Sequence, residues 1–114
     1  MKDESVYLQH VLRCIRRIEE YTSRGRDAFL ASPLVQDATL RNLQTLAEST
    51  QRLSESLKVK HKEVDWQALS GFRNVLVHDY LGIDLERVFD SIENHLPGLL
   101  KAVESLLREA AQTK

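Results

Sequence analysis

Residues 32–57, with the sequence SPLVQDATLRNLQTLAESTQRLSESL, decide the fold class of this chain. Their apolar side chains recur every three or four residues, which is the spacing of one face of an α-helix. Ser32 is a favoured N-cap, and Pro33 suits the first turn because its missing N–H is not needed there. The stretch therefore predicts one helix of about 24 residues, about 36 Å long at 1.5 Å per residue.

The rest of the chain has the same helical periodicity, and we find no alternating strand pattern of useful length. A helix is expected over residues 3–23, packed antiparallel on the helix of residues 32–57. Two further helices should begin at Asp65 and Asp84, because Asp is a good N-cap. In the helix after Asp65, the spacing of Trp66, Leu69 and Phe72 predicts a buried stripe.

Pro97 lies inside the last apolar pattern and is expected to break or kink the helix near residues 94–96. A final helix should then carry the apolar residues 99–107. Short connections between amphipathic helices predict an all-α fold, an antiparallel bundle of four to five helices. The apolar stripes are wide for 114 residues, which favours a homodimer; the alternative is a monomer whose core uses all of them.

Length and composition predict one small domain, residues 1–114, with a single core. With 16 basic and 17 acidic residues, the chain is not a general polyanion binder. Residues 1–62 hold most of the basic side chains, so a nucleic-acid surface would draw on this half; a solvated helix face is the alternative. The arginines concerned are Arg13, Arg16, Arg17, Arg24 and Arg26.

Cysteine content and hydropathy predict a cytoplasmic protein. The single cysteine, Cys14, cannot form an internal disulfide and is expected to be buried or half-buried. The N-terminal residues lack the pattern of a signal peptide. No apolar run approaches the ~20 residues needed to cross a bilayer, so no membrane association is expected.

The segment Arg73-Asn74-Val75-Leu76-Val77-His78-Asp79-Tyr80 carries the chemistry. Arg binds phosphate through a planar fork of donors, and the unperturbed pKa of His, about 6.5, lies nearest neutrality. Together they form a minimal set for cleaving RNA by internal attack of a ribose 2′-OH. His78 would act as base or acid, and Arg73 would hold the phosphate and stabilise its added charge. Asn74 could orient His78 or bind the phosphate, and Tyr80 could donate to an oxygen or stack on a base.

Helical geometry makes this site awkward within one chain. Asn74 and His78 share a face, but Arg73 and His78 lie about 140° apart around an ideal helix. They can still converge, because Arg is long and His78 lies near the helix end, where the backbone could unwind. A single His does not easily serve as both base and acid, and a dimer that pairs two copies of His78 would solve this.

Glu48 and Asp79 are two further residues that could support the site. Glu48 sits on the mostly apolar face of its predicted helix and could bond Arg73 or Asn74, and Asp79 lies next to His78 in the sequence.

The polar residues of this segment also have a purely structural interpretation. In that interpretation, His78 caps the last carbonyls of its helix. In that case Arg73 simply pairs with a carboxylate, which Asp79 or Glu63 could supply.

The pattern Arg73-Asn74-x-x-x-His78-x-Tyr80 resembles the Arg-x4-His-x-Tyr motif of HEPN domains, and specifically of the HepT-like toxin family. The similarity covers roughly residues 3–108. Other segments that resemble the family are Asp65-Trp66-x-x-Leu69-x-x-Phe72, Tyr80-x-Gly82-Ile83-Asp84, the break at Asn94-x-x-Pro97, and Ala47-Glu48-Ser49, where relatives tend to have Gly-Glu-Ala.

The resemblance implies a helical homodimer with Arg73 and His78 at the interface cleft. It also implies a metal-independent endoribonuclease that is the toxin of a toxin–antitoxin pair. The partner would be an MntA-type nucleotidyltransferase antitoxin, which in the family can attach AMP to the motif tyrosine, here Tyr80. AMP would add bulk and negative charge beside Arg73 and block the site.

Neither a metal nor a cofactor is expected, because His10, His61, His78 and His95 lack metal-ligand spacing and no Gly-rich phosphate loop is present. A second class of function remains open from the residues. The octapeptide could belong to a non-catalytic module that binds nucleotide or RNA phosphates, or that only contacts the nucleotidyltransferase.

Overall fold

Helices form every regular element of residues 4–78 and 82–112, the part of the chain that the computed structural model describes, with residues 73–78 described by their backbone alone. The helices are α1 (Ser5–Tyr21), α2 (Arg26–Ala31), α3 (Pro33–Gln51), α4 (Glu55–Lys58), the 3-10 helix η1 (Val59–His61), α5 (Trp66–His78) and α6 (Leu85–Gln112). The prediction of an all-α fold is therefore confirmed.

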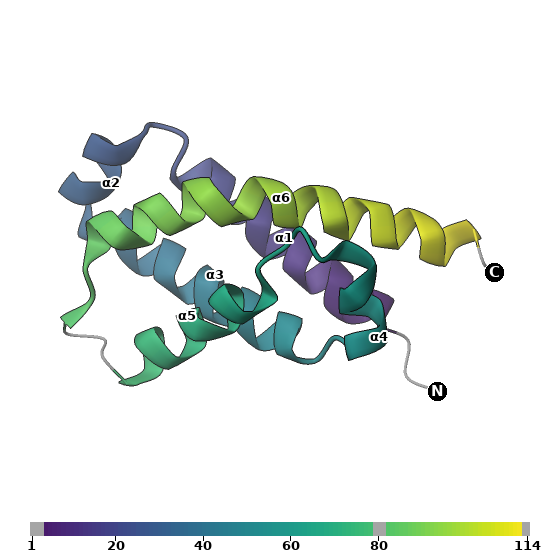
Figure 1. Cartoon of the computed structure of the whole chain (residues 1–114). Helices are drawn as coiled ribbons and strands as arrows, with labels where there is room; N and C mark the ends of the chain where they lie inside the picture. Colours follow the sequence, from purple (N-terminus) through teal and green to yellow (C-terminus); the bar gives the residue numbers. More distant parts are fainter. Residues whose placement is uncertain (1–3, 79–81, 113–114) are drawn as a thin grey trace.

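The long helices α1, α3, α5 and α6 follow one another in alternating directions (Figure 1). Helix α3 packs against both α1 and α5, and α6 packs against α1. The following residues, all 2% exposed or less, fill the space between them: Leu8, Val11, Ile15, Ile18, Leu43, Leu46, Leu69, Leu99, Ala102 and Val103. The bundle and the antiparallel packing of the first two long helices agree with the prediction.

Helix α3 begins where the sequence predicts but ends earlier. The Ser32 hydroxyl accepts a hydrogen bond from the Val35 amide at 3.2 Å, and Pro33 occupies the first turn. The helix then stops at Gln51 rather than near residue 57. Ser54 starts the separate helix α4, because its hydroxyl accepts from the Leu57 amide at 3.2 Å.

A contact distant in sequence holds this break in place. The Glu4 carboxylate accepts hydrogen bonds from the amide and the hydroxyl of Ser54, at 2.6 and 2.9 Å. Leu53, 4% exposed, turns into the core within the break. Periodicity alone could not find this end, because α4 resumes the helical spacing four residues after Gln51.

Helix α2 was not predicted. Gly25 precedes it with φ +95°, a conformation that favours glycine. Phe29 is buried against Phe89 of α6, with ring centroids 5.4 Å apart. Arg26 bonds Asp90 and Glu93 of α6 at 2.5 and 3.2 Å, which fixes the short helix to the bundle.

Pro97 does not break α6, so the predicted break near residues 94–96 and the separate final helix are wrong. The helix continues through it from Leu85 to Gln112. Pro97 lies on the exposed side, while Leu96 and Leu99 are buried on the other side, 3% and 0% exposed. Packing of that apolar face compensates for the missing N–H, since tertiary context overrides intrinsic helix propensity.

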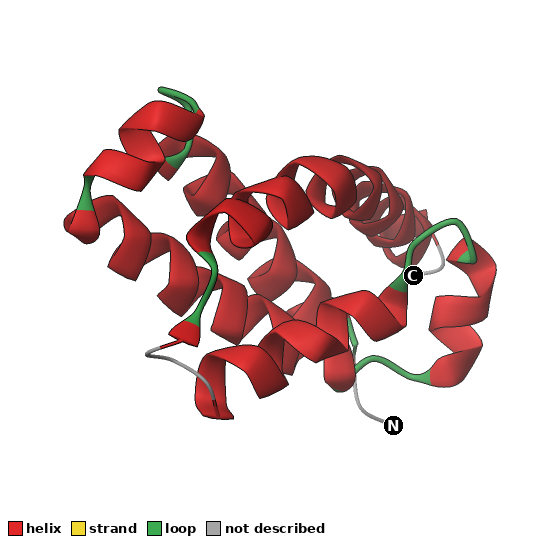
Figure 2. Cartoon of the chain, turned by 60° about the vertical axis from the view of Figure 1, so that its left-hand side comes forward, coloured by secondary structure: helices red, strands yellow, loops and turns green. Residues whose placement is uncertain are grey.

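Two aspartate caps frame the segment of interest, as predicted. The Asp65 carboxylate accepts from the Ala68 amide at 2.9 Å at the start of α5. The Asp84 carboxylate accepts from the amides of Glu86 and Arg87 at 3.1 and 3.3 Å before α6. The connections between helices are short throughout the described chain (Figure 2).

Among the described residues, no helix is both long and apolar enough to cross a membrane.

Candidate functional site

Helix α5 carries most of the predicted site in its last two turns. Its backbone is helical from Trp66 through His78, so Arg73, Asn74 and His78 belong to one continuous helix. Their side chains lie outside the described part of the chain, and so do Asp79 and Tyr80 entirely. The roles assigned to these five residues therefore stay predictions.

The helical backbone does fix the angular positions of Arg73, Asn74 and His78 around the axis of α5. Because α5 is helical as far as His78, the chain does not unwind between Arg73 and His78. The two positions thus remain about 140° apart around the axis, whereas Asn74 and His78, four residues apart, lie on one face.

Glu48 lies on α3, which packs against α5, but its position differs from the expectation of a mostly apolar face. Its side chain is exposed, while the neighbouring Leu46 and Ala47 are fully buried. Its carboxylate accepts a hydrogen bond of 3.4 Å from the Gln44 amide group on the same helix. The suggested bond to Arg73 or Asn74 involves side chains outside the described set and stays a prediction.

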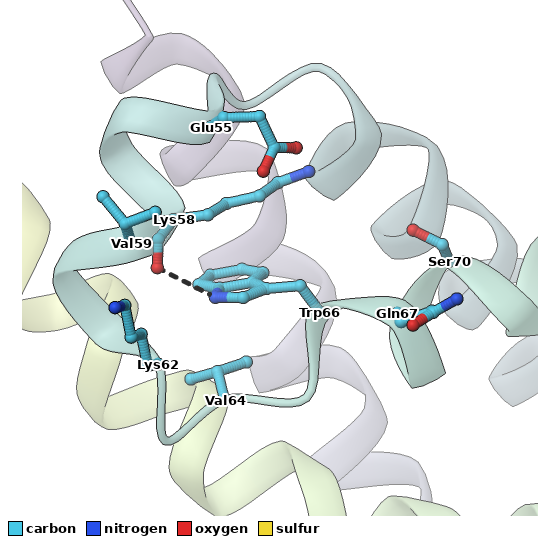
Figure 3. A pocket seen from close by; sticks show the side chains of 8 residues that line it. All are labelled: Glu55, Lys58, Val59, Lys62, Val64, Trp66, Gln67 and Ser70. Atoms are coloured by element: carbon cyan, nitrogen blue, oxygen red, sulfur yellow. Dashed lines mark hydrogen bonds between the residues drawn. The ribbon is translucent and has the colours of Figure 1, made fainter.

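A cavity of about 460 Å³ lies between the α4–η1 segment and the first half of α5 (Figure 3). Its lining residues are Glu55, Lys58, Val59, Lys62, Val64, Trp66, Gln67 and Ser70. Its size is in the range of small-molecule sites. We call it the Trp66 cavity.

Trp66 organises this cavity. Its indole N–H donates to the carbonyl oxygens of Lys58 and His61, at 3.2 and 3.0 Å, and so ties α5 to the segment before it. Trp66 and Phe72 are half-buried, in contrast to the predicted buried stripe, and only Leu69 of the three is fully buried. Part of the indole therefore remains accessible.

A second cavity, of about 410 Å³, lies between α5 and the start of α6. Its lining residues are Ala68, Gly71, Phe72, Gly82, Ile83, Asp84, Arg87, Val88 and Ser91. A Cβ added at Gly71 would meet no described atom within 4 Å, so this part of α5 is loosely covered. Its α5 residues, Ala68, Gly71 and Phe72, directly precede Arg73 in the sequence.

The arginines of the first half are partly committed to structural contacts. Arg16 bonds Glu104 of α6 at 3.3 Å, and Arg26 bonds two carboxylates of the same helix. These ion pairs argue against a nucleic-acid surface at Arg16 and Arg26; the Arg16 side chain remains 57% exposed, as the alternative of a solvated helix face expects.

Shifted pKa values occur away from α5 in the described chain. Burial raises the pKa of the Cys14 thiol, partly offset by the charges of Arg17 and Arg13. The hydrogen bond from His61 at 2.7 Å lowers the pKa of the Glu63 carboxyl. Within residues 4–78 and 82–112, no group of three or more His, Cys, Asp or Glu side chains is arranged to hold a metal ion.

The family model of Ribonuclease HepT-like proteins matches residues 11–106. The chain belongs to this family. A gamma-glutamylcyclotransferase and candidate RNase of Methanocaldococcus jannaschii is 29% identical over 114 residues, 99% of this chain and 51% of that protein, so the chain spans about half of that relative. A candidate RNase of Caldanaerobacter subterraneus subsp. tengcongensis is 29% identical over 110 residues, 96% of this chain and 98% of that protein.

A third relative carries the family name. The protein named Probable ribonuclease HepT of Thermococcus cleftensis is 28% identical over 101 residues, 88% of this chain and 92% of that protein. No solved structure matches the chain significantly. The HepT-like resemblance drawn from the octapeptide and its flanks is thus confirmed.

Sequence reasoning missed the residues of the Trp66 cavity. Of its polar lining residues, Lys58, Lys62, Gln67 and Ser70 were not singled out. A usable signal exists on α5: Gln67 lies seven residues before Asn74 and so on the same face, and Ser70 lies three residues before Arg73 and so close to it around the axis.

Proposed function

We propose that this chain is a metal-independent endoribonuclease, the toxin of a toxin–antitoxin pair. Membership of the HepT-like ribonuclease family is the observation that carries the proposal. The continuous α5 backbone, which holds the Arg-x4-His motif up to its last residue, supports it.

The proposed reaction needs two functions from the protein. A base removes the proton from a ribose 2′-OH, and the resulting oxygen attacks the adjacent phosphorus while the 5′-oxygen leaves with a proton from an acid. His78 supplies the proton transfer, since an imidazole titrates near neutral pH. Arg73 binds the phosphate and stabilises the charge that builds up on it. Asn74, Asp79, Tyr80 and Glu48 support binding or orientation.

The register of α5 favours a site shared by two copies of the chain. With Arg73 and His78 about 140° apart on one helix, a facing second α5 brings an Arg and a His from different protomers together more easily than one helix does. Two copies of His78 in one cleft also separate the roles of base and acid. We therefore propose a homodimer with the cleft at its two-fold axis.

The proposed ribonuclease activity would be inhibited by modification of Tyr80. An MntA-type nucleotidyltransferase antitoxin would attach AMP to its phenol, which places a bulky anion next to the phosphate-binding Arg73. Co-expression with the product of the neighbouring gene, followed by mass spectrometry, should show AMP on the peptide that spans Tyr80. Tyr80→Phe should escape both modification and neutralisation; equal neutralisation of Tyr80→Phe would contradict this part.

Cleavage of RNA in the presence of a chelator tests the catalytic part. The unmodified protein should yield fragments that end in 2′,3′-cyclic phosphate. Arg73→Ala and His78→Ala should each reduce the rate at least about 100-fold, the usual size of an acid–base or charge-stabilising contribution. Arg41→Ala and His10→Ala, which change the same residue types at exposed positions of α3 and α1, should leave the rate unchanged.

Cleavage by clean His78→Ala protein at the original rate would overturn the catalytic assignment. Saturable RNA binding without any product would instead support the non-catalytic binding module.

A further inference from the structure

The Trp66 cavity combines the groups that bind a single-stranded nucleic acid. Two lysines, a partly accessible indole, an amide and a hydroxyl line one space (Figure 3). Nonspecific single-strand binding in proteins relies on positive charge for the backbone and on aromatic rings for the bases. The amide of Gln67 and the hydroxyl of Ser70 add donors and acceptors for base edges or the ribose 2′-OH.

The two lysines are available for a ligand. Neither Lys58 nor Lys62 forms an ion pair with any side chain that the structure describes. Lys60, between them, instead pairs with Glu109 of α6 at 3.8 Å and does not line the cavity. Glu55 is the one acidic residue of the lining, and its carboxylate opposes an anionic ligand.

Trp66 is held in a fixed orientation. Two hydrogen bonds from its indole N–H to the carbonyl oxygens of Lys58 and His61 anchor the pyrrole edge. A stacking surface that is already oriented loses little conformational entropy when a base binds to it. In Figure 3 the Lys58 side chain runs alongside the indole, with Lys62 on one side of the ring and Gln67 and Ser70 on the other.

The cavity is aligned with the predicted catalytic positions. On α5, Gln67 lies on the helix face of Asn74, and Ser70 lies about 60° around the axis from Arg73, which it precedes by about 4.5 Å along the axis. From Trp66 to His78 the rise is about 18 Å. A single strand whose scissile phosphate reaches Arg73 can therefore continue along this face of α5 into the cavity.

We propose that the Trp66 cavity is an RNA-binding subsite, in which Trp66 stacks on a base of single-stranded RNA next to the cleavage point and Lys58 and Lys62 bind its phosphates. The proposal rests on the proposed ribonuclease function and extends it to the substrate. It makes the substrate a flexible single strand, because bases in a duplex are not free to stack on the protein.

Trp66 is the single tryptophan of the chain, so its fluorescence reports on this cavity directly. The probe is a short 2′-O-methyl oligouridylate, which lacks the attacking hydroxyl and is not cleaved. It should quench the fluorescence saturably, and an abasic strand of the same length should bind without the same quenching.

Charge variants define the lysine contacts. The double variant Lys58→Ala/Lys62→Ala should weaken binding about tenfold and reduce the slope of log K against log salt by about 1.4, the value for two phosphates on a single strand. Lys62→Ala alone, at an exposed position, should show about half of this slope change. Glu55→Gln should tighten binding, because it removes the negative charge from the lining. Lys60→Ala is the matched control: it should leave the affinity nearly unchanged and should change the salt slope by less than the effect of about half a phosphate contact.

The kinetic readout separates this proposal from the catalytic one. On cleavable RNA, the double lysine variant should raise KM with little change in kcat, because the subsite binds substrate and transition state alike. His78→Ala should keep the quenching and lose the cleavage. Cleavage by a protein whose Trp66 fluorescence does not respond to RNA would overturn the subsite and leave the ribonuclease proposal standing.

Two other results would also overturn the subsite. The first is equal loss of affinity in Lys60→Ala and in the double variant, which would reduce the effect to net charge. The second is quenching by duplex RNA as strong as that by the single strand, which would exclude base stacking.

Discussion

Cys14 combines burial with a nucleophilic group. Its side chain is 4% exposed in the core face of α1, and burial raises the pKa of the thiol against the opposing effect of Arg17 and Arg13. The thiolate is the reactive form, so the native protein should react with a thiol reagent much more slowly than the unfolded protein. Because the chain has one cysteine, the colour released by Ellman's reagent reports on this residue alone.

The same shift predicts a pH dependence of stability. The folded state holds the Cys14 proton more tightly than the unfolded state does, since its pKa is raised on folding. Stability is therefore fully present below the pKa of the unfolded thiol, about 8.5, and should fall as the pH rises above it. Urea unfolding at several alkaline pH values checks this, and Cys14→Ala should remove that part of the slope; an unchanged slope in Cys14→Ala would contradict it.

Two buried threonines of α3 form a matched pair. The Thr39 hydroxyl is buried and finds no partner among the described residues, whereas the Thr50 hydroxyl donates to the Ala47 carbonyl at 2.8 Å. Valine has nearly the same shape without the hydroxyl. Thr39→Val should stabilise the protein by about 1 kcal/mol, because burying an unpaired hydroxyl is costly. Thr50→Val should not be stabilised in this way, because it also removes a hydrogen bond. Urea unfolding measures both variants, and equal midpoints would contradict the unpaired state of the Thr39 hydroxyl.

At the scale of the helices, local signals predicted the starts better than the ends. Ser32, Asp65 and Asp84 cap as expected, because an N-cap depends on a side chain and the amides two or three residues later. The end of α3 depends on Glu4, fifty residues away from Ser54, which no local pattern reveals. Pro97 was misjudged for the same reason, since the packed face of Leu96 and Leu99 decides the outcome.

Gly98 weakens α6 just after Pro97. A Cβ added there would meet nothing within 4 Å, and the residue is exposed inside a 28-residue helix. Gly98→Ala should therefore stabilise the protein by about 0.5–1 kcal/mol through the lower backbone entropy of the unfolded chain. Thermal unfolding measures the gain, and RNA cleavage should not change.

Gly71 of α5 gives the contrasting substitution. It has the same free space but lines the cavity between α5 and α6. Gly71→Ala should stabilise the helix similarly and also alter cleavage, if RNA or a second subunit enters that cavity. Loss of stability in both alanine variants would show that the backbone at these positions is not regular helix.

At the scale of the whole molecule, the two candidate sites differ in how far the sequence could predict them. The octapeptide is contiguous, so its residue types and spacing were enough to predict a site. The Trp66 cavity requires α4 and η1 to fold back against α5, and this depends on the hydrogen bonds of one indole N–H to two carbonyls. Lys58 and Lys62 show nothing unusual until that fold makes them line one cavity together with Ser70.

The proposed dimer can be tested by mixing inactive subunits. In a cleft where Arg73 of one protomer works with His78 of the other, an Arg73→Ala/His78→Ala heterodimer keeps one intact pair. Random reassortment after mild unfolding should then restore activity above background but below about a quarter of the wild-type level, because half of the dimers are mixed, each has one of two Arg–His pairs, and each holds a single His78 where the proposed cleft uses two as base and acid. A site within each chain restores none, since every protomer lacks one residue. Mixing each variant only with itself is the control, and mixed samples whose activity stays at the level of this control would contradict an Arg73–His78 pair that works across the interface.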